Sequence, residues 1–292
     1  MTVRRHLVLL AAALGACRGA SVRAPNPAPP VREFLVREAN VPHHPISVRL
    51  EIPFAPAGRK PAVIALLGEN DTLRAAGAIV VSFIDWSPKT PPAPAQNTVG
   101  KWVLASPSAA VLGREYHRSI AHTANEVIPR VIDYLVTVPE IDPARIAMTG
   151  SSTNGFITLQ AVAADARLST AVAVAACGDY LRFLRFSTMG MAGQPLELDP
   201  EYERWLHEQE PLRHPERLVH AAVLMVNRVD DPLIPISCAE STAHVLERAY
   251  ARAGVPERFR FVRTQESGHG VGKAEGEEAF AWLRRWLLEP RR

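Results

Sequence analysis

The sequence lacks an excess of charge of either sign outside its first 32 residues. Five of the 33 basic residues lie in residues 1–32, which contain no Asp or Glu, so the other 260 residues carry 28 basic and 30 acidic side chains. Proteins that bind nucleic acids neutralise phosphates with clustered Lys and Arg. A nearly neutral body argues against a nucleic-acid partner.

Cysteine is also scarce, with three in the chain. The only adjacent histidines, His43 and His44, are flanked by prolines and are interpreted as a solvated turn, and no other His or Cys pair has metal-ligand spacing. We therefore expect no metal site. Cys177 and Cys238 could form a disulfide in an exported protein, but buried free cysteines are common small hydrophobes, and we favour that interpretation.

The apolar run at the start of the chain, residues 7–16, is too short to span a bilayer. It follows Arg4 and Arg5 and leads into a Leu-Gly-Ala-Cys tetrad that ends at Cys17, the order of a secretory leader. The tetrad resembles the bacterial lipobox, in which the Cys becomes the lipidated first residue of the mature protein. An ordinary cleaved signal peptide is the alternative.

The domain organisation follows from these features. Residues 1–16 are predicted to be a signal peptide, residues 17–32 a lipidated Cys and a tether with four prolines, and residues 33–292 one folded domain. The protein is then expected to be exported and to be a cell-envelope lipoprotein that meets the membrane only through its lipid anchor. If the anchor is absent, it would be periplasmic or secreted.

From residue 33 onward, short β-branched segments alternate with longer helical ones, which predicts an α/β fold with a mostly parallel sheet and helices on both faces. Strands are expected at residues 46–52, 62–67, 78–84, 145–149, 169–176, 221–226 and 259–262. Helices are expected at residues 115–138, with a bend or break at Pro129, and at 156–164, 200–208, 237–252 and 275–288. The Pro-rich stretch 86–107 is expected near the mouth of a site, and residues 178–215 are predicted to form a small inserted cap.

Ser152 lies in the turn between a predicted strand and the helix at residues 156–164. Its surroundings, Gly-Ser-Ser-Thr-Asn-Gly from Gly150 to Gly155, follow the Gly-x-Ser-x-Gly pattern, in which a strained strand-to-helix turn exposes a nucleophilic Oγ. Asn154 replaces the last glycine of that pattern. Because Asn tolerates positive φ, we expect the turn to form. A helix N-cap is the alternative role for such a serine.

Two later strand ends supply the groups that a nucleophilic hydroxyl needs, a base and a carboxylate that orients it. Asp230 and Asp231 follow one predicted strand, and His269, between two glycines, follows the next. Open α/β sheets place their sites at such carboxyl ends. The order is Ser, Asp, His, so we expect Ser152 to be the nucleophile, one of the two aspartates the acid and His269 the base.

These segments resemble the α/β-hydrolase superfamily over residues 62–288, nearest its prolyl-oligopeptidase-like and dienelactone-hydrolase-like branch. The resemblance rests on residues 139–146 before the serine turn, on the Asp-Pro-Leu-Ile-Pro acid turn from Asp231, and on Gly-His-Gly around His269. It implies that Asp231 is the triad acid and that Asp230 is a turn residue. It also implies an oxyanion hole made by the backbone N–H of Thr153 and by one from the loop after residues 62–67, for which Glu69 is the candidate. Leu67 stands where the family usually has His.

The resemblance implies acyl transfer to Ser152, then hydrolysis by water, with a small-molecule ester or a short peptide as substrate and with no metal or organic cofactor. Peptidases of the prolyl-oligopeptidase type normally have a large N-terminal propeller, for which the segment before residue 62 is too short, so we expect a carboxylesterase. A serine exopeptidase that recognises a free amine through Glu69, Glu197, Glu203 or Glu208 is one alternative. A non-catalytic lipoprotein scaffold, in which Asn154 and Leu67 are signs of decay, is another.

Overall fold

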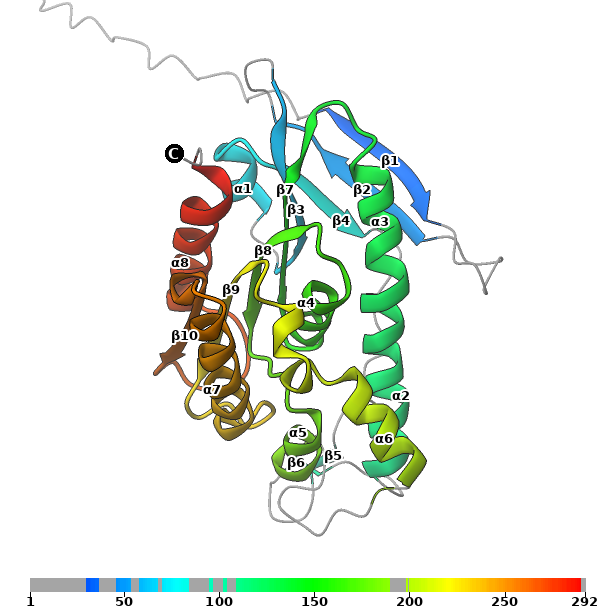
Figure 1. Ribbon diagram of the computed structural model, residues 1–292, viewed down its shortest axis with the longest axis vertical. Helices are drawn as coiled ribbons and strands as arrows, with labels where there is room; N and C mark the ends of the chain where they lie inside the picture. The colour runs from blue at the N-terminus through cyan, green and yellow to red at the C-terminus, as the bar shows by residue number, and fades with distance from the viewer. Residues whose placement is uncertain are drawn as a thin grey trace, which may run out of the picture.

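The computed structural model of the protein describes residues 30–36, 46–53, 58–67, 70–83, 95–96, 102–103, 109–189, 198 and 200–289. Its centre is an eight-stranded sheet with the order β1-β2-β4-β3-β7-β8-β9-β10 (Figure 1). These strands are β1 (Val31–Val36), β2 (Ile46–Glu51), β3 (Lys60–Leu66), β4 (Ile79–Phe83), β7 (Ile141–Ser151), β8 (Leu168–Val174), β9 (Ala222–Arg228) and β10 (Phe259–Thr264). The strands from β4 to β10 in this order are parallel, whereas β2 is antiparallel to both β1 and β4. The predicted mostly parallel sheet is confirmed.

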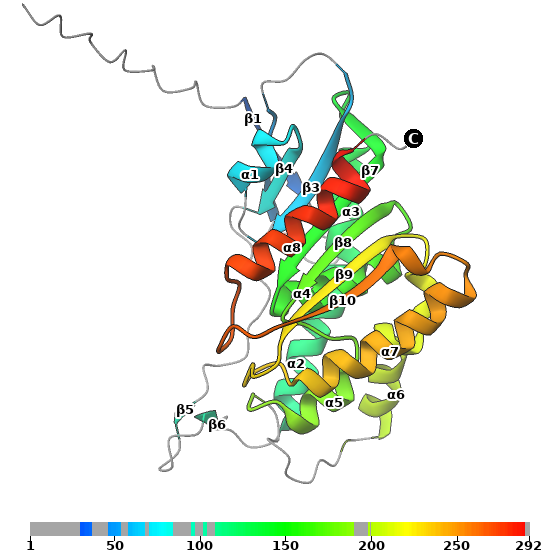
Figure 2. The same ribbon diagram turned by 90° about the vertical axis from the view of Figure 1, so that its left-hand side faces the viewer.

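Helices cover both faces of this sheet. They are α1 (Asn70–Ala75), α2 (Ala109–His122), α3 (Ile128–Leu135), α4 (Thr153–Ala164), α5 (Tyr180–Phe186), α6 (Pro200–Gln209), α7 (Ile236–Arg252) and α8 (Lys273–Leu283). A π-turn at Arg284–Leu288 extends α8, and short 3₁₀ turns lie at Pro211–Arg213, Pro215–Arg217 and Pro256–Arg258. Figure 2 shows α8 crossing in front of the strands, with α3 and α4 behind them.

The burial of each strand explains its place in the sheet. All seven residues of β9 are buried, as expected for a strand covered on both faces, and β3 and β8 are nearly as apolar throughout. In β2 buried and half-buried residues alternate, which is typical of a strand near the edge of the sheet. The opposite edge strand, β10, carries Arg260 and Arg263 on its more exposed positions, and such charges protect an edge from pairing with other chains.

The folded part of the chain begins earlier than the predicted boundary at residue 33. Val31 and Arg32, which were expected in the tether, are the first residues of β1, and the carbonyl of Pro30 accepts a hydrogen bond from Ile52 N at 3.0 Å. The ring of Phe34 stacks on that of Tyr134 with centroids 3.7 Å apart. Residues 1–29 lie outside the described residues, so the signal peptide, the lipid on Cys17 and the rest of the tether stay predictions.

The helix predicted over residues 115–138 is a continuous helical rod made of α2, a π-turn at Thr123–Val127, and α3. The π-turn directly precedes Pro129, which has no N–H to donate to the preceding turn. A local change of hydrogen-bond pattern accommodates that missing donor, so the proline alters the helix without dividing it.

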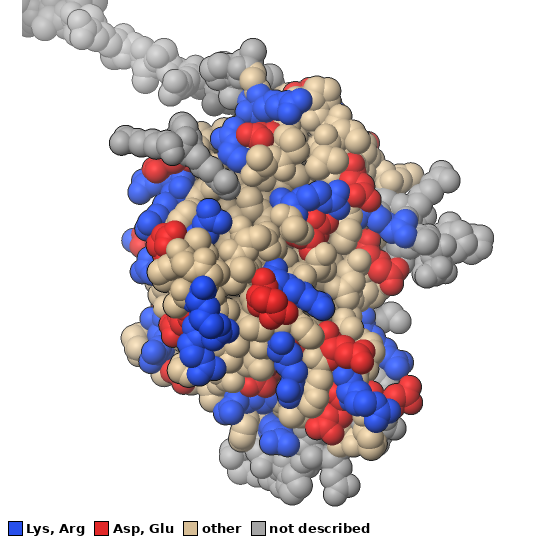
Figure 3. Space-filling model, viewed as in Figure 1, with Lys and Arg blue, Asp and Glu red and all other residues tan. Residues whose placement is uncertain are grey.

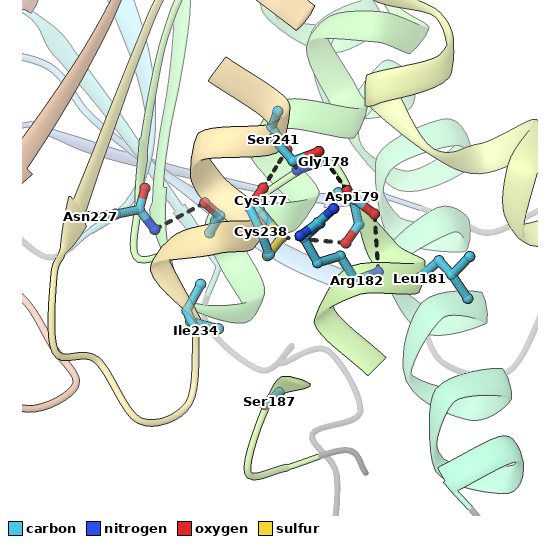
Figure 4. Close-up of a disulfide and its surroundings, with 12 residues drawn as sticks. Cys177, Gly178, Asp179, Leu181, Arg182, Ser187, Asn227, Ile234, Cys238 and Ser241 are labelled. Carbon is cyan, nitrogen blue, oxygen red and sulfur yellow. Dashed lines mark hydrogen bonds and ion pairs between the residues drawn. A yellow bond between two sulfur atoms is a disulfide. The ribbon is translucent and has the colours of Figure 1, made fainter. Parts of the chain in front are cut away.

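Cys177 and Cys238 form a disulfide, so the expectation that they are free was wrong. Cys177 follows β8 and Cys238 lies in the first turn of α7, and their Cα atoms are 5.8 Å apart (Figure 4). Parallel neighbours such as β8 and β9 end at the same edge of a sheet, and this brings two cysteines 61 residues apart in sequence into contact. The bond joins the segment that leads into α5 to the start of α7.

Residues 178–215, the predicted cap, contain α5, α6 and the 3₁₀ turn at Pro211–Arg213, with residues 190–197 and 199 outside the described residues. In the Pro-rich stretch 86–107 the structure describes a small antiparallel ribbon of β5 (Ala95–Gln96) and β6 (Trp102–Val103).

No helix within the described ranges is long and apolar enough to cross a bilayer. Acidic and basic side chains are interspersed on the face shown in Figure 3.

Candidate active site

Ser152 lies in a strained turn where β7 passes into α4. Its backbone has φ 55° and ψ −126°, a conformation that costs a residue other than glycine about 1–3 kcal/mol. Hydrogen bonds hold it there: Ser152 N donates to Val174 O at 2.9 Å, and Ser152 O accepts from Gly155 N at 2.8 Å and Phe156 N at 3.1 Å. This geometry presents the Oγ above the carboxyl end of the sheet, as the serine pattern predicts.

Two glycines make the turn possible by allowing close packing. A Cβ on Gly150 would lie 2.3 Å from Asn154 O, and a Cβ on Gly155 would lie 2.7 Å from the Cβ of Ala176. Neither distance is compatible with a side chain. Gly155 therefore permits the close approach of α4 to the strand beside it.

The departure from the pattern at Asn154 has no backbone consequence. Among the described residues other than glycine, positive φ occurs at Ser152 and Ala175, so Asn154 needs no tolerance of that region and the reason expected for the turn's survival was wrong. Asn154 is an ordinary residue of α4, and its Nδ2 donates to Leu66 O at 3.4 Å. The amide thus links the serine turn to the end of β3.

His269 and Asp231 complete a chain of hydrogen bonds with Ser152. His269 Nε2 lies 2.9 Å from Ser152 Oγ, and His269 Nδ1 lies 2.8 Å from Asp231 Oδ2. The other carboxylate oxygen, Asp231 Oδ1, accepts from the backbone N–H groups of Leu233 at 2.8 Å and Ile234 at 3.0 Å. With Nδ1 donating to the buried carboxylate, Nε2 has its lone pair free to accept the serine proton. The three residues that the sequence predicts are brought together.

The glycines beside His269 have a specific backbone role. Gly268 has φ +76° and Gly270 has φ +145°, regions that disfavour any residue with a Cβ. The backbone conformations of these two glycines direct the imidazole towards Ser152. The imidazole itself is about one-fifth exposed, so a substrate can reach its Nε2 side.

Two other acidic residues near the site, Asp230 and Asp179, make hydrogen bonds outside the chain formed by Ser152, His269 and Asp231. Asp230 is exposed and accepts a hydrogen bond from Ser267 Oγ at 3.0 Å, as fits a turn residue. Asp179 caps α5 by accepting from Arg182 N at 3.0 Å and binds Ser241 Oγ at 2.7 Å (Figure 4). Of the acids considered, Asp231 is the one hydrogen-bonded to the imidazole of His269.

The predicted oxyanion hole is described in part. Thr153 is the first residue of α4, next to Ser152, and its Oγ1 lies 3.1 Å from the hydroxyl of Tyr116. Gly68 and Glu69 lie outside the described residues, so the second donor stays a prediction. Tyr116, which sequence reasoning missed, is fully buried, and this burial raises its pKa well above the ordinary value, which keeps the hydroxyl neutral.

The described residues under α5 are packed core. Tyr116, Phe156, Tyr180 and Phe183 form one aromatic cluster with ring centroids 5.0–6.2 Å apart, and the ring of His117 stacks on that of Tyr180 at 4.6 Å. This cluster supports α5 and the residue next to the nucleophile. Its members are hydrophobic side chains separated along the sequence, so no local pattern points to their contact.

The glutamates considered as amine anchors are dispersed. Glu69 and Glu197 lie outside the described residues, and Glu203 and Glu208 belong to α6. Glu208 borders a cavity of about 300 Å³ together with Gln160 and the last residues of α4. At 1.5 Å per helical residue, that cavity is about 12–18 Å along α4 from Ser152. A substrate bound at the nucleophile would have to be long to reach it.

The sheet order, the helices on both faces and the serine turn define an α/β-hydrolase fold. The chain belongs to the prolyl oligopeptidase family. The sequence model of that family matches residues 110–289, which are more than half of this chain. That match contains Ser152, Asp231 and His269.

Known proteins similar to the chain include both esterases and peptidases. YitV of Bacillus subtilis (strain 168), which carries the name of an esterase, is 24% identical over 153 residues, which are 50% of this chain and 59% of that protein. A puromycin-hydrolyzing peptidase of Mycobacterium tuberculosis superimposes with a TM-score of 0.65 at 22% identity, over 92% of this chain and 41% of the peptidase. A cold-adapted esterase from an Arctic intertidal metagenomic library superimposes with a TM-score of 0.56 at 13% identity, over 88% of this chain and 93% of the esterase. The chain thus spans less than two thirds of the first two proteins.

Proposed function

We propose that the protein is a serine hydrolase that cleaves a carboxylic ester through an acyl-enzyme. The observation that carries this proposal is the hydrogen-bond chain from Ser152 Oγ through His269 to Asp231, at the carboxyl end of the sheet. An unassisted serine hydroxyl is a poor nucleophile, and a base oriented by a buried carboxylate activates it. Such a chain of three groups would be an unexplained coincidence in a scaffold that only binds.

The reaction follows from the positions of these groups. Ser152 Oγ attacks the ester carbonyl while His269 Nε2 takes the hydroxyl proton, and Asp231 stabilises the resulting imidazolium. The backbone N–H of Thr153, at the start of α4, donates to the oxyanion. The imidazolium then gives its proton to the leaving alcohol, and water, activated by the same imidazole, hydrolyses the acyl-enzyme and restores Ser152.

Two observations favour an ester over a peptide as substrate. The Arctic esterase matches the chain over nearly the full length of both proteins, and YitV also carries an esterase name. In addition, Glu208 of α6 borders a cavity that lies about 12–18 Å along α4 from Ser152, too far to bind the amine of a short peptide whose scissile bond lies at Ser152. The puromycin-hydrolyzing peptidase and the name of the family make peptide hydrolysis the second candidate.

The proposal is tested with one acyl group presented as a p-nitrophenyl ester and as a p-nitroanilide. We expect turnover of the ester to exceed that of the anilide, and Ser152→Ala to abolish both turnover and labelling by a fluorophosphonate probe. Preference for the anilide would establish the peptidase alternative. Absence of labelling in the folded wild-type protein would instead establish a non-catalytic scaffold.

We also propose that the protein is exported and carries a lipid on Cys17. The disulfide between Cys177 and Cys238 supports export, because disulfides persist in oxidising compartments and are rare in the cytosol. Mass spectrometry of the membrane-bound protein should find an acylated N-terminal Cys17. Cys17→Ser should move the protein to the soluble fraction, and an unmodified Cys17 in the mature protein would refute the anchor.

A further inference from the structure

The segment that carries His269 has neither helix nor strand to fix it. It runs from Gln265 to Gly272, between β10 and α8, and three of its eight residues are glycines. A nucleophile and its base must stay within hydrogen-bond reach of each other, and a shift of 1 Å is costly for catalysis. Contacts from elsewhere in the fold must therefore hold this segment in place.

Arg228, the last residue of β9, supplies such contacts. Its Nη1 donates to the carbonyl oxygens of Ser267 at 2.8 Å and Gly268 at 3.4 Å, the two residues before His269. The Arg228 side chain is nearly fully buried. The turn after the same strand carries Asp231. One strand end thus supplies both the carboxylate that binds the imidazole and the cation that binds the backbone behind it.

Two carboxylates orient the guanidinium and hold the rest of the segment. Arg228 Nη2 donates to Glu266 Oε2 at 2.8 Å and to Glu275 Oε2 at 3.0 Å, and Arg228 Nε donates to Glu275 Oε1 at 3.2 Å. The fully buried Glu275 also accepts from Gly272 N at 2.7 Å and from the hydroxyl of Thr264. Hydrogen bonds therefore reach the beginning, the middle and the end of the segment.

Glu275 stays ionised at neutral pH, which keeps its ion pair with Arg228 intact. Burial opposes ionisation of that carboxyl, but hydrogen bonds from Arg228, Thr264 and Gly272 prevail and lower its pKa to about 2. The pair is thus ionised at neutral pH. An Arg is suited to the place because its planar fork can serve two carboxylates and two carbonyls at once, which the single ammonium of Lys cannot.

We propose that Arg228 is a positioning residue that holds His269 against Ser152 by fixing the backbone of residues 266–272, with Glu275 and Glu266 as its supports. The proposal rests on the serine hydrolase function proposed above. Arg228 contacts the backbone beside the catalytic base, and it acts on the reaction through that base alone.

The test compares Arg228→Lys with Arg167→Lys as a matched control. Arg167 is also an arginine in a hydrogen-bonded cluster, bound to Asp165, Asp133 and the carbonyl of Pro129, and its side chain is more exposed than that of Arg228. It lies just before the amino end of β8, at the edge of the sheet away from Ser152. We expect Arg228→Lys to lower kcat about 10²-fold with little change in KM. Amide hydrogen exchange over residues 266–272 should accelerate. Arg167→Lys should leave both kcat and that exchange near the wild-type values.

A double-mutant cycle separates positioning from general damage. In a His269→Ala background, Arg228→Lys should cause no further loss, because the group it positions is gone. Losses that multiply, or a kcat of Arg228→Lys equal to that of Arg167→Lys, would overturn the proposal. If Arg228→Lys does not fold, Glu266→Gln replaces it. Its carboxylate is partly exposed, so the same faster exchange and lower kcat are expected, and unchanged values would overturn the proposal.

Wild type and Ser152→Ala are measured in parallel, so the two proposals can fail separately. If the wild type shows no turnover that depends on Ser152, the hydrolase function is wrong, and hydrogen exchange of residues 266–272 still decides whether Arg228 fixes the segment. If turnover depends on Ser152 but is insensitive to Arg228, only the positioning role is wrong.

Discussion

Removal of the Cys177–Cys238 disulfide should lower the free energy of unfolding by about 4 kcal/mol at 25 °C. The bond closes a loop of 61 residues, and the chain entropy that such a loop removes from the unfolded state corresponds to that value. Both sulfurs are fully buried, so a reductant in native buffer has little access to them. The double variant Cys177→Ala/Cys238→Ala is therefore the appropriate perturbation.

The assay is urea unfolding at 25 °C, followed by tryptophan fluorescence and circular dichroism, on the oxidised wild type and the double variant. Hydrolase activity in native buffer should be largely retained, because hydrogen bonds from Ser187 and Thr188 to the carbonyls of Leu233 and Pro232 still hold the end of α5 to the acid turn. Dithiothreitol should shift the midpoint of the wild type alone. A stability difference below about 1 kcal/mol, or an equal effect of dithiothreitol on the double variant, would refute this reasoning.

Three further changes test other parts of the site. Asp231→Asn should lower kcat about 10⁴-fold by favouring the wrong imidazole tautomer, and Asp230→Asn should leave it nearly unchanged; the opposite ranking in steady-state kinetics would exchange their roles. Gly155→Ala should destabilise the fold by about 1–3 kcal/mol, measured by thermal unfolding, because its Cβ would collide with the strand beside α4. Glu275 has a pKa of about 2, below its ordinary 4.5, so its stabilising contribution is complete above pH 4.5 and is lost as the pH falls towards 2. Glu275→Gln should flatten the pH dependence of the unfolding free energy in that range, and an unchanged slope would contradict the assignment.

The parts of the fold that the sequence predicts are those with a local signal. The continuous apolar runs of β3 and β4 identify buried parallel strands, and the residues after β7, β9 and β10 fall at one edge of the sheet whatever the details of packing. That is why Ser152, Asp231 and His269 could be proposed together. Strand order brings the three residues to one edge of the sheet, whereas their hydrogen bonds also require the serine turn and the contacts that hold the His269 segment.

The features that were missed depend on contacts outside their own segment of the chain. β1 is fixed by its pairing with the next strand, β2, while Tyr116 and Arg228 contact partners about 40 residues away. The disulfide is different, because its signal was present. Cys177 and Cys238 lie after neighbouring predicted strands, and the strand-edge reasoning that joined the site residues would also have joined them.

The antiparallel pairings of β1 with β2 and of β2 with β4 determine where the N-terminal tether joins the sheet relative to Ser152. Two reversals cancel, so β1 runs in the same direction as β7, and its first residue, Val31, lies at the opposite edge of the sheet from Ser152 (Figure 1). With the proposed anchor at Cys17, the 13 residues up to Pro30 can span at most about 45 Å. Lipidation would thus keep the amino end of the sheet within about 45 Å of the membrane, with the active site at the opposite end of the strands from the point where the tether joins.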